Sequence, residues 1–137
     1  MAALDTNVIV RWLVKDDAAQ TAHVQTLLDA RLRGQQTLFI PVTVLLETEW
    51  VLRSRYRFDK ASITAALDAL LSTTELEFES EPAAEQALWQ FKQAAAADFA
   101  DCLHVALAHH AGKGPLLTFD RQAAKLVGAV LVTAANT

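Results

Sequence analysis

The sequence predicts an α/β fold with a parallel sheet, and three observations support this prediction. Short apolar runs alternate with longer segments of helical pattern along the 137 residues. Strands joined by helices form right-handed crossovers, which give a parallel sheet with helices on both faces. The runs "PLLTF" and "AVLVT" are apolar throughout, as in strands buried on both faces. With 53% hydrophobic residues, we expect one packed domain over residues 1–137.

The first half of the chain contains three expected strands and four expected helices. The strand "AAL" ends at Asp5, and a helical run follows from Thr6 to about Val14. A second helix begins near Asp17 and is ended by Gly34. The elements that follow are the strand "TLFIP", ended by Pro41; the helix "VTVLLETEWVLRSRY"; the helix "DKASITAALDALL", with Asp59 as its N-cap; and the strand "ELEF".

The second half continues the alternation. The alanine-rich sequence after Pro82 favours a helix through Ala97, because Ala has the highest helix propensity and Pro is tolerated in a first turn. Asp98 is a candidate N-cap for a helix that runs to Gly112. The last elements are the strand "PLLTF", a short helix capped by Asp120 and running to about Val127, and the strand "AVLVT".

Composition restricts the possible functions. The net charge is −4, so overall charge does not favour nucleic acid, and a phosphate ligand must be met by local cations or a bound metal. No run approaches the roughly 20 apolar residues that cross a bilayer, and no signal-peptide pattern is visible. Cys102 is the only cysteine, which excludes an internal disulfide. We therefore expect a cytoplasmic protein.

Two apolar strands end on an aspartate. Asp5 follows "AAL" and Asp120 follows "PLLTF", at the carboxyl ends of strands, where open parallel sheets bind ligands. A helix N-cap explains both residues equally well. Asp98 and Asp101 lie three residues apart, on one face of a first helical turn, which indicates either a capping pair or a cation site.

Glu47 and Glu49 interrupt an otherwise apolar helix, so at least one of them is expected to lie out of bulk water. They differ by about 200° around the helix axis, so only one can face a given cleft, and periodicity does not choose between them. If one converges with Asp5, Asp101 and Asp120, repulsion raises pKa values unless a cation neutralises the group. Such hard oxygen ligands suit Mg²⁺ or Mn²⁺ and metal-assisted hydrolysis of phosphodiesters.

Four fragments resemble one family. "LDTNVIVRWLVKDD", "IPVTVLLETEWVLR", "ADFADCLHVALA" and "LLTFDR", in this order and spacing, are similar to the PIN domain, and specifically to VapC-type toxins of bacterial toxin–antitoxin pairs. The resemblance covers nearly the whole chain. It implies a three-layer α/β/α sandwich, a Mg²⁺- or Mn²⁺-dependent endoribonuclease acting on RNA, a VapB-like antitoxin as partner, and a homodimer.

The resemblance also implies roles for individual residues. It selects Glu47 over Glu49, and it adds Asp98 as a lesser candidate for a metal ligand. The polar pair Thr6 and Asn7 is expected to orient the first aspartate. The implied catalytic acids are Asp5, Glu47, Asp101 and Asp120, and the implied metal ligands are Asp5, Asp101 and Asp120.

Two further groups of residues are candidates. Thr118 lies two residues before Asp120, hence on the same strand face, and could fix the rotamer of that carboxylate. In "RSRYRFDK" the cations Arg53, Arg55 and Arg57 could contact RNA phosphates. A solvated helix end with cations near its C-terminus explains the same charges.

Two other functions are compatible with the residues. One is a phosphohydrolase that uses Asp5 as a covalent nucleophile, although the related dehalogenase pattern has a second Asp where this chain has Asn7. The other is a catalytically inert, PIN-like module that binds a partner. Retention of all four matched acids argues against the inert module.

Overall fold

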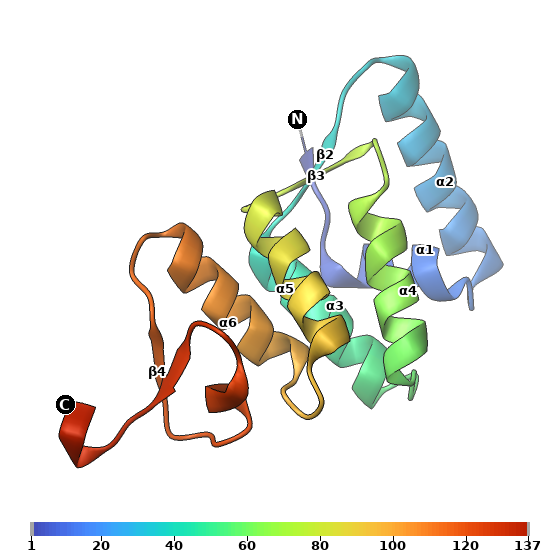
Figure 1. The fold of residues 1–137 in the computed structure, drawn as a ribbon. Coiled ribbons are helices and arrows are strands. Elements are labelled where there is room, and N and C mark those ends of the chain that lie inside the picture. Colours follow the sequence, from blue (N-terminus) through green and yellow to red (C-terminus); the bar gives the residue numbers. More distant parts are fainter. Residues whose placement is uncertain (1, 137) are drawn as a thin grey trace. The chain divides into compact units, whose positions relative to one another are not determined.

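The computed structural model describes residues 2–136, in which the chain forms six α-helices and five short strands (Figure 1). The chain divides into two compact units, Met1–Glu79 and Ser80–Thr137. Strands pair in parallel within each unit, and the predicted α/β fold with parallel strands is confirmed. The single domain expected over residues 1–137 stays a prediction.

The first unit is a three-stranded parallel sheet with four helices. The strand order is β1-β2-β3, with Ala2 opposite Leu38 and Leu38 opposite Leu76. Leu38 and Ile40 of the central strand are fully buried, so this strand lies at the centre of the core. The elements are β1 (Ala2–Ala3), α1 (Thr6–Val14), α2 (Ala18–Arg33), β2 (Leu38–Ile40), α3 (Val42–Ser54), α4 (Lys60–Leu71) and β3 (Leu76–Phe78).

Local capping fixes where these helices begin. Asp17 accepts a hydrogen bond from the Gln20 amide at 3.0 Å and begins α2. Asp59 accepts one from the Ser62 amide at 2.8 Å and begins α4, as predicted. This backbone hydrogen bond lowers the pKa of Asp59, because it stabilises the ionised carboxylate. At the other end of α1, Lys15 takes a left-handed conformation with φ 59° and closes the helix.

The second unit contains two helices and a parallel pair of strands. Helices α5 and α6 lie side by side (Figure 1). Phe91 of α5 meets Phe99 of α6 edge to face, with ring centroids 5.8 Å apart. Gly128 has φ 95°, and a Cβ there would lie 2.9 Å from Val105 Cγ1, so glycine permits this close packing against α6. The elements are α5 (Glu81–Gln93), α6 (Phe99–His110), β4 (Leu116–Thr118), the 3₁₀ turn η1 (Ala123–Lys125), β5 (Ala129–Leu131) and the 3₁₀ turn η2 (Ala134–Asn136).

Several helices differ from the prediction, and the first is α3, which ends at Ser54 and not at Tyr56. Helix α5 ends at Gln93 and not at Ala97, because Ala94 is already extended and the chain must turn into α6. Helix α6 ends at His110 rather than Gly112. After Asp120 the chain forms only the short 3₁₀ turn η1 in place of the expected α-helix. Helix propensity alone predicted longer helices, because it does not take account of the turns that the chain makes between these elements.

The expectation that both strands of the second unit are buried on both faces was wrong. Leu117 in β4 is 58% exposed and Val130 in β5 is 37% exposed. Their neighbours Leu116, Thr118 and Leu131 are half-buried, so one face of the pair packs and the other meets solvent. An apolar run therefore did not indicate burial here. No helix within residues 2–136 is long and apolar enough to cross a membrane.

Candidate functional site

The first acid is positioned by the start of α1. Asp5 directly follows the strand end, and its Oδ1 accepts a hydrogen bond from the Thr6 amide at 2.7 Å. Thr6 is buried, and its hydroxyl donates to Glu47 Oε1 on α3. One threonine therefore contacts both carboxylates, the first through its backbone and the second through its side chain. The expectation that Thr6 and Asn7 orient Asp5 stays a prediction.

The two glutamates of α3 have different surroundings. Glu47 is exposed on the side of Thr6, whereas Glu49 is only 1% exposed. Glu49 binds Arg53 one turn along the helix, with Arg53 Nε 2.9 Å from Oε2 and Nη2 3.4 Å from Oε1. Glu49 thus forms a structural ion pair with Arg53, and it is the acid of α3 that lies out of bulk water. Glu47 is the acid that shares a cavity with Asp5.

This cavity, the Asp5 cavity, has a volume of about 280 Å³ and lies within the first unit. It combines two carboxylates with two guanidinium groups, those of Arg11 and Arg55, and with the half-exposed indole of Trp50. Carboxylates can bind a cation or transfer protons, and guanidinium groups can bind phosphate. The lining residues are Asp5, Thr6, Asn7, Val10, Arg11, Glu47, Trp50, Val51, Arg55 and Tyr56.

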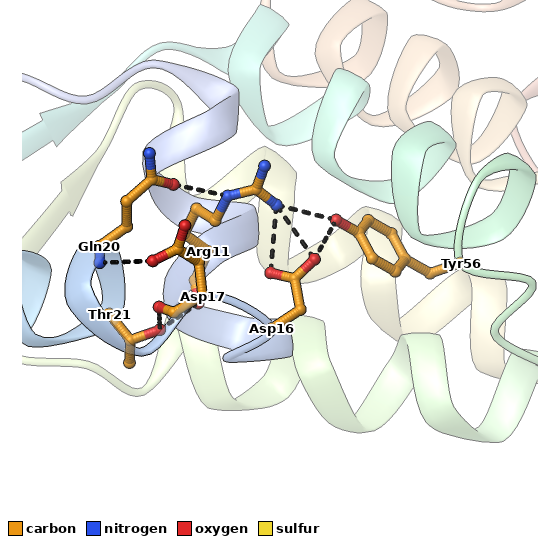
Figure 2. A network of polar contacts seen from close by, with 6 residues as sticks. All are labelled: Arg11, Asp16, Asp17, Gln20, Thr21 and Tyr56. Atoms are coloured by element: carbon orange, nitrogen blue, oxygen red, sulfur yellow. Dashed lines mark hydrogen bonds and ion pairs between the residues drawn. The ribbon is translucent and has the colours of Figure 1, made fainter.

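Arg11 is held by a polar network that joins three parts of the first unit (Figure 2). Its Nε donates to Gln20 Oε1 at 2.7 Å, and its Nη1 donates to Asp16 at 3.1 and 3.2 Å and to the Tyr56 hydroxyl at 3.0 Å. The hydrogen bond with Tyr56 and the charge of Asp16 raise the pKa of Arg11. Sequence reasoning missed Arg11, although it lies four residues after Asn7 and hence on the same helix face.

The three candidate RNA-binding arginines are not equivalent. Arg55 lines the Asp5 cavity, whereas Arg53 binds the buried Glu49. Arg57 lies in the loop before α4 with φ 56°, a left-handed conformation. Of the three, Arg55 is the cation that can meet a ligand beside Asp5.

Two acids of the second unit, Asp98 and Asp120, accept hydrogen bonds from backbone amides a few residues ahead. Asp98 Oδ1 accepts from the Asp101 amide at 2.9 Å and begins α6. Asp120 Oδ1 accepts from the amides of Gln122 at 2.8 Å and Ala123 at 3.1 Å. The predicted cap at Asp98 is confirmed, whereas the hydrogen bonds of Asp120 close a turn, and Gln122 is the N-cap residue of η1. Thr118 Oγ1 accepts from the Asp120 amide at 2.9 Å, so it contacts the backbone of Asp120 and not its carboxylate.

The pKa of Asp101 is raised above its ordinary value. Burial of its carboxyl is the largest cause, followed by the negative charge of Asp98 and a side-chain hydrogen bond with it, and Asp120 adds a smaller repulsion. Asp101 therefore senses both neighbouring acids. A cation near these carboxylates would favour the ionised form of Asp101.

The donor chemistry of both units fits Mg²⁺ or Mn²⁺, because every predicted ligand is a carboxylate oxygen. Within residues 2–136, no three acid, histidine or cysteine side chains are grouped as a ready metal site. In the first unit, Asp5 and Glu47 both form a hydrogen bond with Thr6. In the second unit, Asp101 lies close enough to Asp98 and Asp120 for their charges to raise its pKa. Convergence of all four acids stays a prediction.

A family profile described as PIN domain matches residues 2–129, which is nearly the whole chain. No curated protein matches the sequence.

Proposed function

Because this chain belongs to the PIN domain family, whose members are generally nucleases, we propose that it is a metal-dependent endoribonuclease. The catalytic acids are Asp5, Glu47, Asp101 and Asp120. The observation that carries the proposal is that Asp5 and Glu47 both contact Thr6. They do so beside a cavity that is also lined by the guanidinium groups of Arg11 and Arg55. A nuclease site needs this combination of acids and phosphate-binding groups.

Each residue of the proposed site has a definite task. Asp5, Asp101 and Asp120 are the metal ligands, with Asp98 as a further candidate, and Mg²⁺ or Mn²⁺ would polarise a phosphoryl oxygen and lower the pKa of a bound water. Thr6 holds Glu47 by its hydroxyl, which limits the rotamers of that carboxylate. Arg55 attracts the phosphate backbone to the cavity.

The test is cleavage of RNA with added Mg²⁺ or Mn²⁺. Asp5→Asn keeps a side chain that can cap α1 but removes a negative ligand, so activity should fall about a hundredfold or more. Asp29→Asn, an equal change at an exposed position on α2, should leave the activity unchanged. Cleavage at full rate in a chelator would contradict the proposal.

We further propose that the chain is the toxin of a VapBC-type pair, acting in the cytoplasm as a homodimer that a VapB-like antitoxin inhibits. The four matched fragments support this assignment. Expression should arrest bacterial growth, and co-expression of a small protein encoded directly upstream should relieve the arrest. Asp5→Asn should not arrest growth, and mapping of new RNA 5′ ends should identify the cleaved RNA. Equal arrest by both chains would contradict the toxin assignment.

A further inference from the structure

A second cavity adjoins the Asp5 cavity in the first unit. It has a volume of about 300 Å³ and will be called the His23 cavity. Asn7 and Arg11 line both cavities, so these two side chains form the boundary between them. The lining residues are Asn7, Val8, Arg11, Gln20, His23 and Val24, which come from α1 and α2.

At this boundary, Arg11 is oriented by hydrogen bonds that use only some of its N–H donors. The network fixes Nε on Gln20 and Nη1 on Asp16 and Tyr56 (Figure 2). Within the part of the chain that the structure describes, Nη2 has no hydrogen-bond partner. A guanidinium that is held on one side and open on the other is preorganised to bind an anion, since little side-chain entropy is lost on binding.

The lining of the His23 cavity suits a nucleobase. Asn7 and Gln20 provide amides that donate and accept hydrogen bonds, and His23 provides an imidazole ring. Val8 and Val24 provide apolar contact. Single-stranded RNA is recognised by hydrogen bonds to base edges and by stacking on flat side chains, and the volume lies at the small end of ligand pockets.

We propose that Arg11 binds a backbone phosphate of single-stranded RNA at this boundary, and that the adjoining nucleotide places its base in the His23 cavity. This inference rests on the proposed nuclease function, because the strand would continue into the Asp5 cavity. The polar, small lining favours a nucleotide over a protein segment, which would need a longer apolar surface.

The experiment measures RNA binding separately from RNA cleavage. The full-length Asp5→Asn chain is titrated into a short, fluorescein-labelled, single-stranded RNA pool of random sequence, at several salt concentrations and without metal. Loss of one phosphate contact should reduce the slope of log affinity against log salt by about 0.7. In this background, Arg11→Gln should reduce the slope by that amount and lower the affinity about tenfold. Arg33→Gln, at an exposed cation near the end of α2, is the matched control.

Two further variants separate RNA contact from damage to the fold. Arg11→Lys should restore the salt slope, because it keeps the charge, but should restore the affinity only in part, because it lacks the planar fork. His23→Ala should lower the affinity about fivefold with an unchanged slope, since it removes a base contact. His104→Ala, an exposed histidine on α6, should have no effect.

Three results would overturn the inference: no binding of the RNA pool, an unchanged slope in Arg11→Gln, or unchanged affinity in His23→Ala. The nuclease proposal is judged on other data, the metal-dependent cleavage by the unmodified chain. Cleavage with an unchanged slope in Arg11→Gln would sink this inference alone. The expected slopes without cleavage by the unmodified chain would sink the nuclease proposal alone.

Discussion

The acids of the two units are held in opposite ways. In the first unit, Asp5 and Glu47 accept hydrogen bonds from a neutral residue, Thr6, and line a cavity with two guanidinium groups. In the second unit, burial raises the pKa of Asp101, and the nearby acids Asp98 and Asp120 raise it further. The acids of the first unit are therefore held by hydrogen-bond donors, whereas Asp101 lies beside other carboxylates.

In the first unit, hydrogen bonds from Thr6 orient Asp5 and Glu47. In the second unit, a divalent cation near Asp101 would relieve the repulsion from its acidic neighbours. A pKa that is raised by burial and by neighbouring acids, as at Asp101, is typical of catalytic sites and supports the proposed nuclease.

Removal of the Thr6 hydroxyl is the change with the largest expected effect. It removes the hydrogen bond to Glu47 that distinguishes the acids of the first unit from those of the second. Thr6→Val keeps the shape of the buried side chain but releases Glu47, so RNA cleavage should fall about tenfold to a hundredfold, as for other residues that orient ligands. The free energy of unfolding should fall by only about 1 kcal/mol. The measurements are kcat/KM for RNA cleavage and denaturant unfolding.

The control for this substitution is Thr26→Val on α2, whose hydroxyl donates only to the Ala22 carbonyl at 2.9 Å. It should change neither activity nor stability appreciably. Unchanged cleavage by Thr6→Val would mean that the contact with Glu47 has no functional role, and the two units would then differ only in charge.

Interactions within a few residues could be predicted from the sequence. The caps at Asp59 and Asp98 were predicted because an aspartate side chain meets the amide three residues ahead of it. The order of strands and helices along the chain was predicted from the alternation of apolar patterns, which are also set by neighbouring residues. Each such element depends on residues close in the chain.

Contacts between distant residues could not be predicted from spacing. Periodicity could not choose between Glu47 and Glu49, because the choice depends on Thr6, which is 41 residues away from Glu47. The same holds for the contact of Arg11 with Tyr56, which are 45 residues apart. Family resemblance selected Glu47 where physical reasoning from the sequence could not.

The smaller expected effect concerns Asp101 and the pH dependence of stability. The pKa of Asp101 is raised in the folded chain, so the folded state binds the proton more tightly than the unfolded state does. The free energy of unfolding therefore falls as the pH rises from about 4, near the pKa of an unfolded Asp, through the raised pKa. In a metal-free buffer near neutral pH, Asp101→Asn should therefore stabilise the fold, by less than about 1 kcal/mol because the site is largely solvated. Asp5→Ala should instead destabilise the fold by about 1 kcal/mol, since it removes a cap.

Denaturant unfolding between pH 4 and pH 8 with a chelator measures both changes. The gain from Asp101→Asn should diminish at high salt, which screens the repulsion, and should reverse on addition of Mg²⁺ if Asp101 is a ligand, because only the unmodified chain then gains binding energy. Loss of stability in Asp101→Asn at neutral pH without metal would show that repulsion does not govern the second unit, and the contrast between the two groups of acids would fail.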